Sequence, residues 1–401
     1  MLKKRSLFFA LMSVCLSSDV KARETAQSEK SPSTSFKFGK GLEFVAKDSS
    51  ASLKLGVRFQ TLLAAERSLA EDADFEKEMS IRRFRIKMDG FAFSPRLVYK
   101  IELALSNRDN SSVIPQGANA ANIVLDAVLK YQLNQNTELW FGQTKLPGNR
   151  ERVISSQALQ FVDRSLVNSY FNLDRDLGVQ LHHEFNIGNI VIRDKWAMAL
   201  GQGRNITMSD TGGFSYTGRI EVLPFGAFTG GGDYFDADFA RESRPKLSVA
   251  AGYSYNDGAM REGGELGSFV GVQRDLSTFF ADAMLKYRGW SLTTEFMDKR
   301  TDQSPVVPNT SNFFQTGYGW NLQSGYLFKN NIELAGRYTF VNPSQAIREA
   351  ELMGKTDEYT VVVSKYFSRH NLKIQTDLSH TKDELDENGS IRYRLQVEMA
   401  L

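Results

Sequence analysis

The stretch that decides the fold reads Ser52-Leu53-Lys54-Leu55-Gly56-Val57-Arg58-Phe59-Gln60-Thr61. Apolar side chains occupy every second position from Leu53 to Phe59, and polar or small residues stand between them. This period of two is the pattern of a β-strand, because successive side chains of a strand point to opposite faces of the sheet. The stretch therefore predicts a strand with one apolar face and one polar face.

The same alternation recurs along the chain and predicts about sixteen strands. We place them near residues 52–61, 79–93, 96–106, 122–133, 137–144, 175–187, 190–202, 213–225, 245–257, 274–287, 289–301, 312–328, 331–342, 356–368, 371–382 and 389–401. Short turns and longer polar loops alternate between these strands, which is typical of an outer-membrane β-barrel with tight periplasmic turns. The connection over residues 225–244 interrupts this rhythm, because it is long and contains three consecutive glycines.

The last predicted strand alternates up to Leu401, with its apolar residues on one face. We expect it to pair with the first strand, because closure into a barrel leaves neither strand with an unpaired edge. Aromatic residues cluster beside the short turns and predict a ring of side chains at the depth of the lipid headgroups. They are Tyr99, Tyr131, Phe185, Tyr287, Trp290, Phe328, Tyr366 and Phe367.

The third long connection, within residues 142–178, has no period of two over about thirty residues. Residues 152–167 instead show the looser apolar spacing of a short helix. A connection this long usually has a function of its own. We predict that it folds into the lumen and narrows it, and its cations are Lys145, Arg150, Arg152 and Arg164.

The first residues read as an export signal. Lys3, Lys4 and Arg5 precede a short apolar run over 7–16, and Val20-Lys21-Ala22 is a cleavage site of the small-residue type. We expect export to the outer membrane of a Gram-negative bacterium. The predicted organisation is a signal peptide, a periplasmic lead-in and a transmembrane barrel, over residues 1–22, 23–51 and 52–401.

Charge and cysteine content exclude several classes of protein. Four of the 49 basic residues and one of the 47 acidic residues lie within residues 1–22, so the exported chain has a net charge of −1. The exported chain has no excess of positive charge that would indicate a nucleic-acid partner. The only cysteine, Cys15, lies in the signal, so the exported chain has no thiol for a disulfide or for a cysteine-ligated metal.

Cations on the polar faces of the first three strands are the candidate functional residues. We predict that they form one basic wall of the lumen: Arg58, Arg83, Arg85, Lys87, Arg96 and Lys100. Guanidinium groups suit phosphate and carboxylate, because they offer forked hydrogen-bond donors. The alternative is a generic polar lining, since acidic residues such as Glu102 and Asp126 face the same way.

Enzyme chemistry is not predicted. The four histidines stand in no metal-binding spacing, and no nucleophile motif accompanies them. We therefore expect no catalytic residues, no bound metal and no cofactor.

The order of several short motifs resembles the phosphate-selective porin O/P family of Gram-negative outer membranes. The motifs are Gly39-Lys40-Gly41-Leu42-Glu43, Leu55-Gly56-Val57-Arg58-Phe59-Gln60, Arg82-Arg83, Leu125-Asp126-Ala127, Gly142-Gln143 with Lys145 and Pro147, Asp163-Arg164-Ser165, and Arg175-Asp176-Leu177-Gly178-Val179. The resemblance implies a trimer of 16-stranded barrels whose third loop narrows the pore. It also implies that lumen arginines draw anions toward a constriction that contains lysines.

Arg82 and Arg83 match an arginine pair of the family's binding region, but Arg85 stands where the family's pattern has an aromatic residue. We therefore expect a diffusion porin for small hydrophilic solutes with a modest preference for anions, phosphate among them. Its expected partners are membrane lipid, small anions and two further copies of the chain. The alternative function is a structural or adhesive outer-membrane barrel with a blocked lumen.

Overall fold

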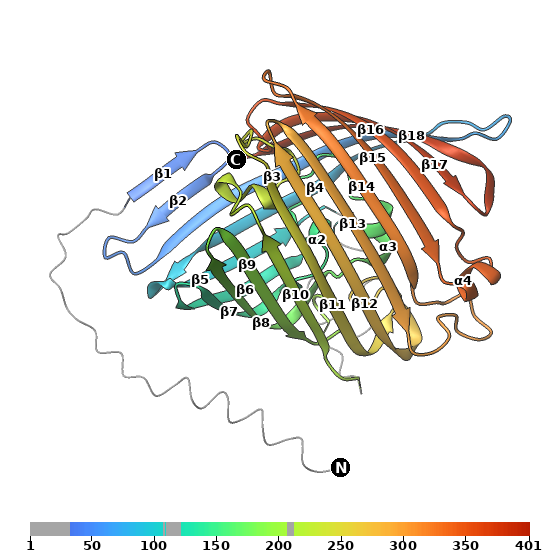
Figure 1. Ribbon diagram of the computed structural model, residues 1–401, viewed down its shortest axis with the longest axis horizontal. Coiled ribbons are helices and arrows are strands. Elements are labelled where there is room, and N and C mark those ends of the chain that lie inside the picture. Colours follow the sequence, from blue (N-terminus) through green and yellow to red (C-terminus); the bar gives the residue numbers. More distant parts are fainter. Residues whose placement is uncertain (1–32, 107–108, 110–121, 207–211) are drawn as a thin grey trace, which may run out of the picture.

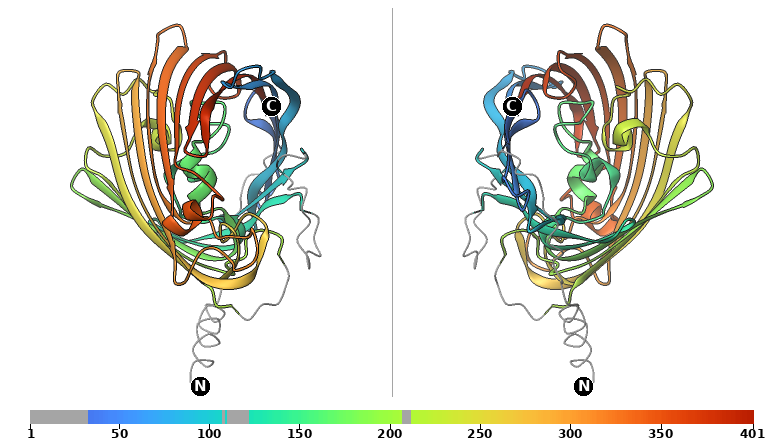
Figure 2. Two further views of the ribbon diagram at one scale, coloured as in Figure 1. Left: turned by 90° about the vertical axis from the view of Figure 1, so that its right-hand side faces the viewer. Right: turned by 90° about the vertical axis from the view of Figure 1, so that its left-hand side faces the viewer.

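The computed structural model describes residues 33–106, 109, 122–206 and 212–401. Within this part, the sixteen antiparallel strands β3 to β18 form a sheet whose last strand pairs with its first. The register from Ala400↔Arg58 to Ser390↔Ser68 joins β18 to β3. The sheet thus closes on itself, which satisfies the backbone of both end strands. The predicted barrel and its strand number are confirmed, and Figure 2 shows the ring of strands.

The strands lie close to their predicted positions. They are β3 (Ser52–Ser68), β4 (Glu76–Ala92), β5 (Ser94–Ala104), β6 (Val124–Asn134), β7 (Thr137–Lys145), β8 (Arg175–Ile187), β9 (Ile190–Ala199), β10 (Ser215–Leu223), β11 (Lys246–Arg261), β12 (Phe269–Tyr287), β13 (Trp290–Thr301), β14 (Gly317–Leu327), β15 (Ile332–Pro343), β16 (Thr356–Tyr366), β17 (Leu372–Asp383) and β18 (Asp386–Ala400). Burial follows the predicted alternation: in β16, Val361 is 56% exposed on the outer face and Val362 is 1% exposed inside. None of the helices among the described residues has both the length and the apolar character needed to cross a bilayer.

A small hairpin precedes the barrel. Its strands β1 (Ser33–Lys37) and β2 (Gly41–Val45) are joined by a turn in which Gly39 has a φ of 74°. β2 pairs with the first residues of β3, from Leu42↔Leu55 to Val45↔Ser52, so the hairpin continues the barrel sheet beyond β18. Figure 1 shows the hairpin at one end of the barrel. The predicted signal, its cleavage site and Cys15 lie outside the described residues.

The aromatic residues beside the short turns face outward with one exception. Tyr131, Trp290, Phe328 and Phe367 are exposed on the outer surface, as expected. Tyr366 is buried on the inside, where its hydroxyl group donates to a carboxylate oxygen of Glu333. The prediction was wrong for Tyr366, because consecutive residues of a strand point to opposite faces and Tyr366 and Phe367 cannot both face outward.

The connection between β7 and β8, residues 146–174, is called the inner loop below. It contains two short helices, α2 (Arg150–Val153) and α3 (Leu166–Phe171), and no helix spans 152–167. The predicted helix was therefore wrong. The apolar residues between α2 and α3 pack into separate clusters on the barrel wall: Ile154 and Leu159 with Met284, and Phe161 with Ala335 and Val362. A single helix could not present these side chains to wall positions so far apart.

The inner loop is bonded to inward-facing side chains of several strands. Asn149 donates to Glu295 of β13 at 2.8 Å, and Arg150 donates to Asp282 of β12 at 2.6 Å. Gln160 donates to Glu333 of β15 at 2.6 Å. Leu146, Val167, Phe171 and Leu173 form an apolar cluster with Ala197, Ala199, Phe280, Met297 and Val341 of the wall. Figure 2 shows the inner-loop helix inside the ring of strands.

The connection between β10 and β11, residues 224–245, also turns inward and is called the long turn below. It contains the 3-10 helix η2 (Thr229–Tyr234). The backbone N–H of Asp236 donates to the carbonyl of Ala158 at 3.1 Å, and the N–H of Gln160 donates to the Asp236 carboxylate at 3.0 Å. Lys286 of β12 donates to the carbonyls of three residues of the long turn. The irregular length seen in the sequence thus reflects a segment that contacts the inner loop from the opposite end of the barrel.

Candidate functional site

A cavity of about 380 Å³ remains between the inner loop and one side of the barrel wall. Strands β4 to β9 supply most of its lining, and the inner loop and the long turn supply the rest. The lining residues are Arg85, Lys87, Lys100, Glu102, Lys130, Trp140, Thr144, Lys145, Leu146, Pro147, Val153, Ser155, Arg175, Gln180, His182, Lys195 and Tyr234. Seven of these are lysine or arginine, and Glu102 is the one carboxylate among them.

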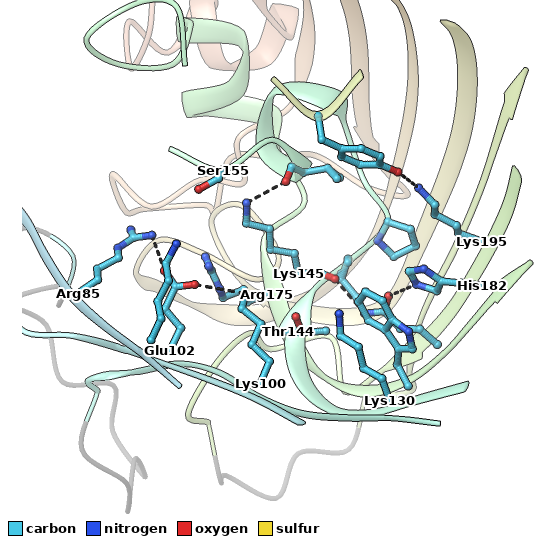
Figure 3. Close-up of a pocket in the computed structure, with 17 residues that line it drawn as sticks. Arg85, Lys100, Glu102, Lys130, Thr144, Lys145, Ser155, Arg175, His182 and Lys195 are labelled. Carbon is cyan, nitrogen blue, oxygen red and sulfur yellow. Dashed lines mark hydrogen bonds and ion pairs between the residues drawn. The ribbon is translucent and has the colours of Figure 1, made fainter. Parts of the chain in front are cut away.

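The strands position the cations by their alternation. Arg85 and Lys87 are two residues apart on β4, so both point inward, and Lys100 and Glu102 are placed in the same way on β5. The register sets Lys87 opposite Glu102 and Arg85 opposite Ala104. Figure 3 shows Arg85, Lys100, Glu102 and Arg175 gathered on one side of the cavity, with Lys195 and His182 on the other. The sequence prediction of a basic wall is therefore matched in position by Arg85, Lys87 and Lys100.

Several of these cations are neutralised by carboxylates. Arg85 pairs with Glu102 and with Asp109, each at 2.9 Å. Lys100 pairs with Asp126 at 2.7 Å, and Arg175 pairs with the same carboxylate at 3.0 Å. Lys195 of β9 is 3.3 Å from Glu221. These buried pairs fix the wall, and they leave those cations with less charge to offer to a solute.

Three lysines account for the remaining positive charge. In the part of the chain that the structure describes, no carboxylate lies within ion-pair distance of Lys87, Lys130 or Lys145. Lys130 lies over the ring of Trp140, with its ammonium group 3.5 Å from the centroid. Lys145 donates to the carbonyls of residues 152–154, at the end of α2, at 2.6, 3.1 and 3.1 Å. The cavity is consequently cationic even after the ion pairs are taken into account.

Arg82 and Arg83 tie the inner loop to β4. A bulge sets Gln60 opposite Arg83 and Thr61 opposite Ile81, so Arg82 is an extra residue and turns inward together with its neighbour. Both guanidinium groups bond to Asp163 of the inner loop, at 3.1 Å for Arg82 and 2.9 Å for Arg83. Burial alone would raise the pKa of Asp163, but the two guanidinium groups outweigh it and hold this pKa below its usual range.

The other predicted residues lie apart from the cavity lining. Arg58 pairs with Glu398 at 2.8 Å, which joins two residues of the barrel wall. Arg150 bonds to Asp282 and Ser248, which joins the inner loop to the wall. Arg152 pairs with Asp174, and Arg164 donates to the carbonyls of Glu151 and Ile154 within the loop. Arg96 is exposed at the start of β5.

Sequence reasoning did not assign a place in the lumen to six charged or aromatic residues that line the cavity, and Arg175 among them was noted as part of a family motif alone: Lys130, Trp140, Arg175, His182, Lys195 and Tyr234. The alternation of β6 and β7 would have placed Lys130 and Trp140 inside, because Leu129 and Phe141 face outward. Tyr234 belongs to the long turn, and no local pattern indicates that this turn folds inward. Among the described residues, no group of three or more His, Cys, Asp or Glu side chains could hold a metal ion.

Comparison with known proteins gives one family and a set of barrels of the same fold. The model of the family described as phosphate-selective porin O and P matches residues 52–397. No curated protein matches the chain. The outer membrane channel DcaP of Acinetobacter baumannii is similar with a TM-score of 0.56 and 13% identity, over 90% of this chain and 100% of that chain.

Two further solved structures show the same likeness. An anion-selective porin from Comamonas acidovorans has a TM-score of 0.55 and 13% identity, over 88% of this chain and 100% of that chain. OmpT of Vibrio cholerae, in its trimer form, has a TM-score of 0.52 and 11% identity, over 88% and 100%. At such low identity these likenesses establish the shared fold.

Proposed function

This chain belongs to the phosphate-selective porin O and P family and is an outer-membrane porin, and we propose that it passes small hydrophilic solutes with a preference for anions. The observation that carries the proposal is the lining of the cavity, with seven lysine or arginine side chains and one carboxylate. Rings of charged side chains are the usual filter of a pore, because they attract one sign of ion and repel the other.

The inner loop determines where solutes pass. Its apolar residues pack mostly against β12, β13, β15 and β16, which supply no residue to the cavity lining, and in part against Ala197 and Ala199 of β9. A solute would therefore travel along the basic side of the lumen, between the inner loop and the wall. The screening length is about 10 Å at 0.1 M salt, so an ion that comes within this distance of Lys87, Lys130 or Lys145 still experiences the charge of that lysine.

Phosphate is one solute that this lining would accept. Ammonium and guanidinium groups donate strong hydrogen bonds to phosphate oxygens. The guanidinium groups of Arg83, Arg85 and Arg175 already bond to Asp163, Glu102 and Asp126, however, and a phosphate ion would have to compete with these carboxylates. We therefore propose a modest preference for anions rather than tight binding of phosphate.

We also propose the assembly and the route of export. OmpT of Vibrio cholerae has been solved as a trimer, which supports a homotrimer here. Residues 1–22 have the composition of a cleaved export signal, which supports export to the outer membrane by that route. We also propose that the channel has no enzymatic activity, because no nucleophile motif accompanies its histidines. An adhesive barrel with a blocked lumen is the competing function, and the cavity argues against it.

The test is the reversal potential of the purified protein in a planar bilayer that separates two concentrations of potassium chloride. The proposal expects stable conductance and a reversal potential displaced toward that of chloride. Absence of conductance in a heat-modifiable, folded protein would favour the adhesive barrel. A displacement toward the potassium potential would contradict the anion preference.

A further inference from the structure

The cavity has apolar walls as well as charges. Leu146, Pro147 and Val153, all in the inner loop, form one side of it. Trp140 and Tyr234 add two large aromatic surfaces from the barrel wall and the long turn. A pore that served inorganic ions alone would gain nothing from such surfaces, because an ion keeps water between itself and an apolar wall.

Neighbouring side chains hold Trp140 in place. Its ring stacks on His182, with centroids 4.0 Å apart and planes at 20°, and Lys130 lies over the ring. Its indole N–H donates to Glu138 at 2.8 Å. His182 and Lys130 cover the faces of the ring, and its edge, fixed in place, offers apolar contact to a solute at little cost in conformational entropy.

Tyr234 reaches the cavity because the long turn folds inward. Its hydroxyl group accepts a hydrogen bond from Lys195 at 2.7 Å, and the Lys195 ammonium group lies 5.3 Å from the centre of its ring. The preceding residue, Asp233, pairs with Arg193 and accepts a hydrogen bond from Arg150 through its carbonyl. The long turn thus carries one aromatic wall of the cavity and is fixed both to the barrel and to the inner loop.

Two ammonium groups of the lining, of which Lys130 lies next to Trp140, have hydrogen-bond donors to offer. Among the described residues, Lys87 and Lys130 donate to no oxygen, whereas Lys145 is bonded to three carbonyls and Lys195 to Tyr234. An incoming anion would therefore meet donors at Lys87 and Lys130 without breaking an existing hydrogen bond. The same ligand could place an apolar group against Trp140, Pro147 and Tyr234.

We propose that the cavity is a binding site for organic anions that carry one aromatic ring, with the anionic group on Lys130 and the ring against Trp140 and Tyr234. This inference rests on the proposed function as an anion-preferring porin, because the same cavity is the path of the solutes. A volume of about 380 Å³ lies within the ~300–1,000 Å³ typical of small-molecule sites.

The test compares two anions that differ in the apolar group alone, phenylphosphonate and methylphosphonate, as blockers of the potassium chloride current through single channels. Phenylphosphonate should halve the current at a concentration about tenfold lower. A tenfold ratio corresponds to ~1.4 kcal/mol, which is the burial of about 55 Å² of apolar surface. Benzyl alcohol, which has the ring but no charge, should not block at either concentration.

Variants locate the effect. Trp140→Ala should abolish the advantage of phenylphosphonate, and Trp320→Ala, which removes a tryptophan from the outer face of β14, should keep it. Tyr234→Ala provides a second variant in a turn, outside the strand ladder, and should reduce the advantage at least threefold. Folding of each variant is checked by its heat-dependent mobility in SDS.

The two proposals fail in different ways. Equal block by the two phosphonates in an anion-selective channel would overturn the aromatic site and leave the porin proposal intact. An advantage that survives both Trp140→Ala and Tyr234→Ala would also overturn it. A channel that selects cations would overturn the proposed function, and the inference with it.

Discussion

Replacing Phe161 with alanine should release the inner loop without unfolding the barrel. Phe161 is 2% exposed and packs against Ala335 and Val362 on the inner wall. The guanidinium group of Arg337 lies 4.5 Å from the centre of its ring. Truncating a buried phenylalanine to alanine typically costs ~3–5 kcal/mol. Because Phe161 belongs to a loop, this cost falls on the docking of the loop and not on the strand ladder.

The expected magnitude follows from these numbers. At ~1.4 kcal/mol per tenfold, the ratio of docked to undocked inner loop should fall roughly 100- to 4,000-fold. Since the inner loop lies inside the ring of strands (Figure 2), we expect Phe161→Ala channels to show a larger mean conductance and more frequent transitions to a high-conductance level. The measurement is single-channel recording in a planar bilayer.

The matched control is Phe141→Ala, because Phe141 is 64% exposed on the outer face of β7 and touches no part of the inner loop's apolar clusters. This variant should conduct like the parent. If folded Phe161→Ala channels have the parent's conductance and the parent's noise, then the inner loop does not depend on this contact. The apolar packing of the inner loop would then not define the passage.

Three further predictions follow from individual contacts. Lys286→Met leaves the carbonyls of Gly232, Phe235 and Ala237 in the long turn without their hydrogen-bond donor. Each unsatisfied carbonyl costs ~1–3 kcal/mol, so limited proteolysis should cut the variant at Gly230-Gly231 faster than the parent. Asp163→Asn removes the carboxylate that holds Arg82 and Arg83, and should increase conductance noise at pH 7. Burial raises the pKa of Glu265, in the β11–β12 connection, to about 7. A carboxyl group whose pKa is raised in the folded state destabilises the protein as pH rises from about 4.5 to about 7. Glu265→Gln removes this effect, so it should raise the thermal unfolding temperature at pH 8, by the equivalent of up to ~3 kcal/mol. At pH 4 the unfolding temperature should not change.

The sequence predicted the barrel well because alternation is a local property. The side chains of Leu53, Arg58 or Val361 reveal which face they occupy through their immediate neighbours, and sixteen such segments have a limited set of ways to close. The same rule, applied consistently to Tyr366 and Phe367, would have placed Tyr366 inside. The alternation rule could not predict the bulge that turns Arg82 inward, because a bulge depends on how β3 pairs with β4 and not on β4 alone.

The site was harder to predict because its chemistry depends on contacts between distant residues. Arg83 and Arg85 were placed inside correctly, but their partners Asp163 and Asp109 come from loops. Lys130 lies on a correctly predicted strand, but the sequence analysis did not name it as a lumen residue. That it has no carboxylate partner in the described structure follows from the fold and not from the sequence. Tyr234 could not be foreseen, because the position of the long turn is set by Lys286 and Arg193 on other strands.

The most direct test of the central claim compares the reversal potential of the parent with that of Lys87→Gln/Lys130→Gln in a potassium chloride gradient. Both lysines line the passage without a carboxylate partner among the described residues. The matched control is Lys329→Gln, an exposed lysine in the turn between β14 and β15. The account predicts that the double variant loses most of its anion preference, while the control keeps its anion preference. The loss should be larger at ~0.03 M than at ~1 M salt, because low salt screens the lysine charges less. A double variant that inserts, conducts and retains the parent's reversal potential at low salt would contradict the claim that these cations select the solute.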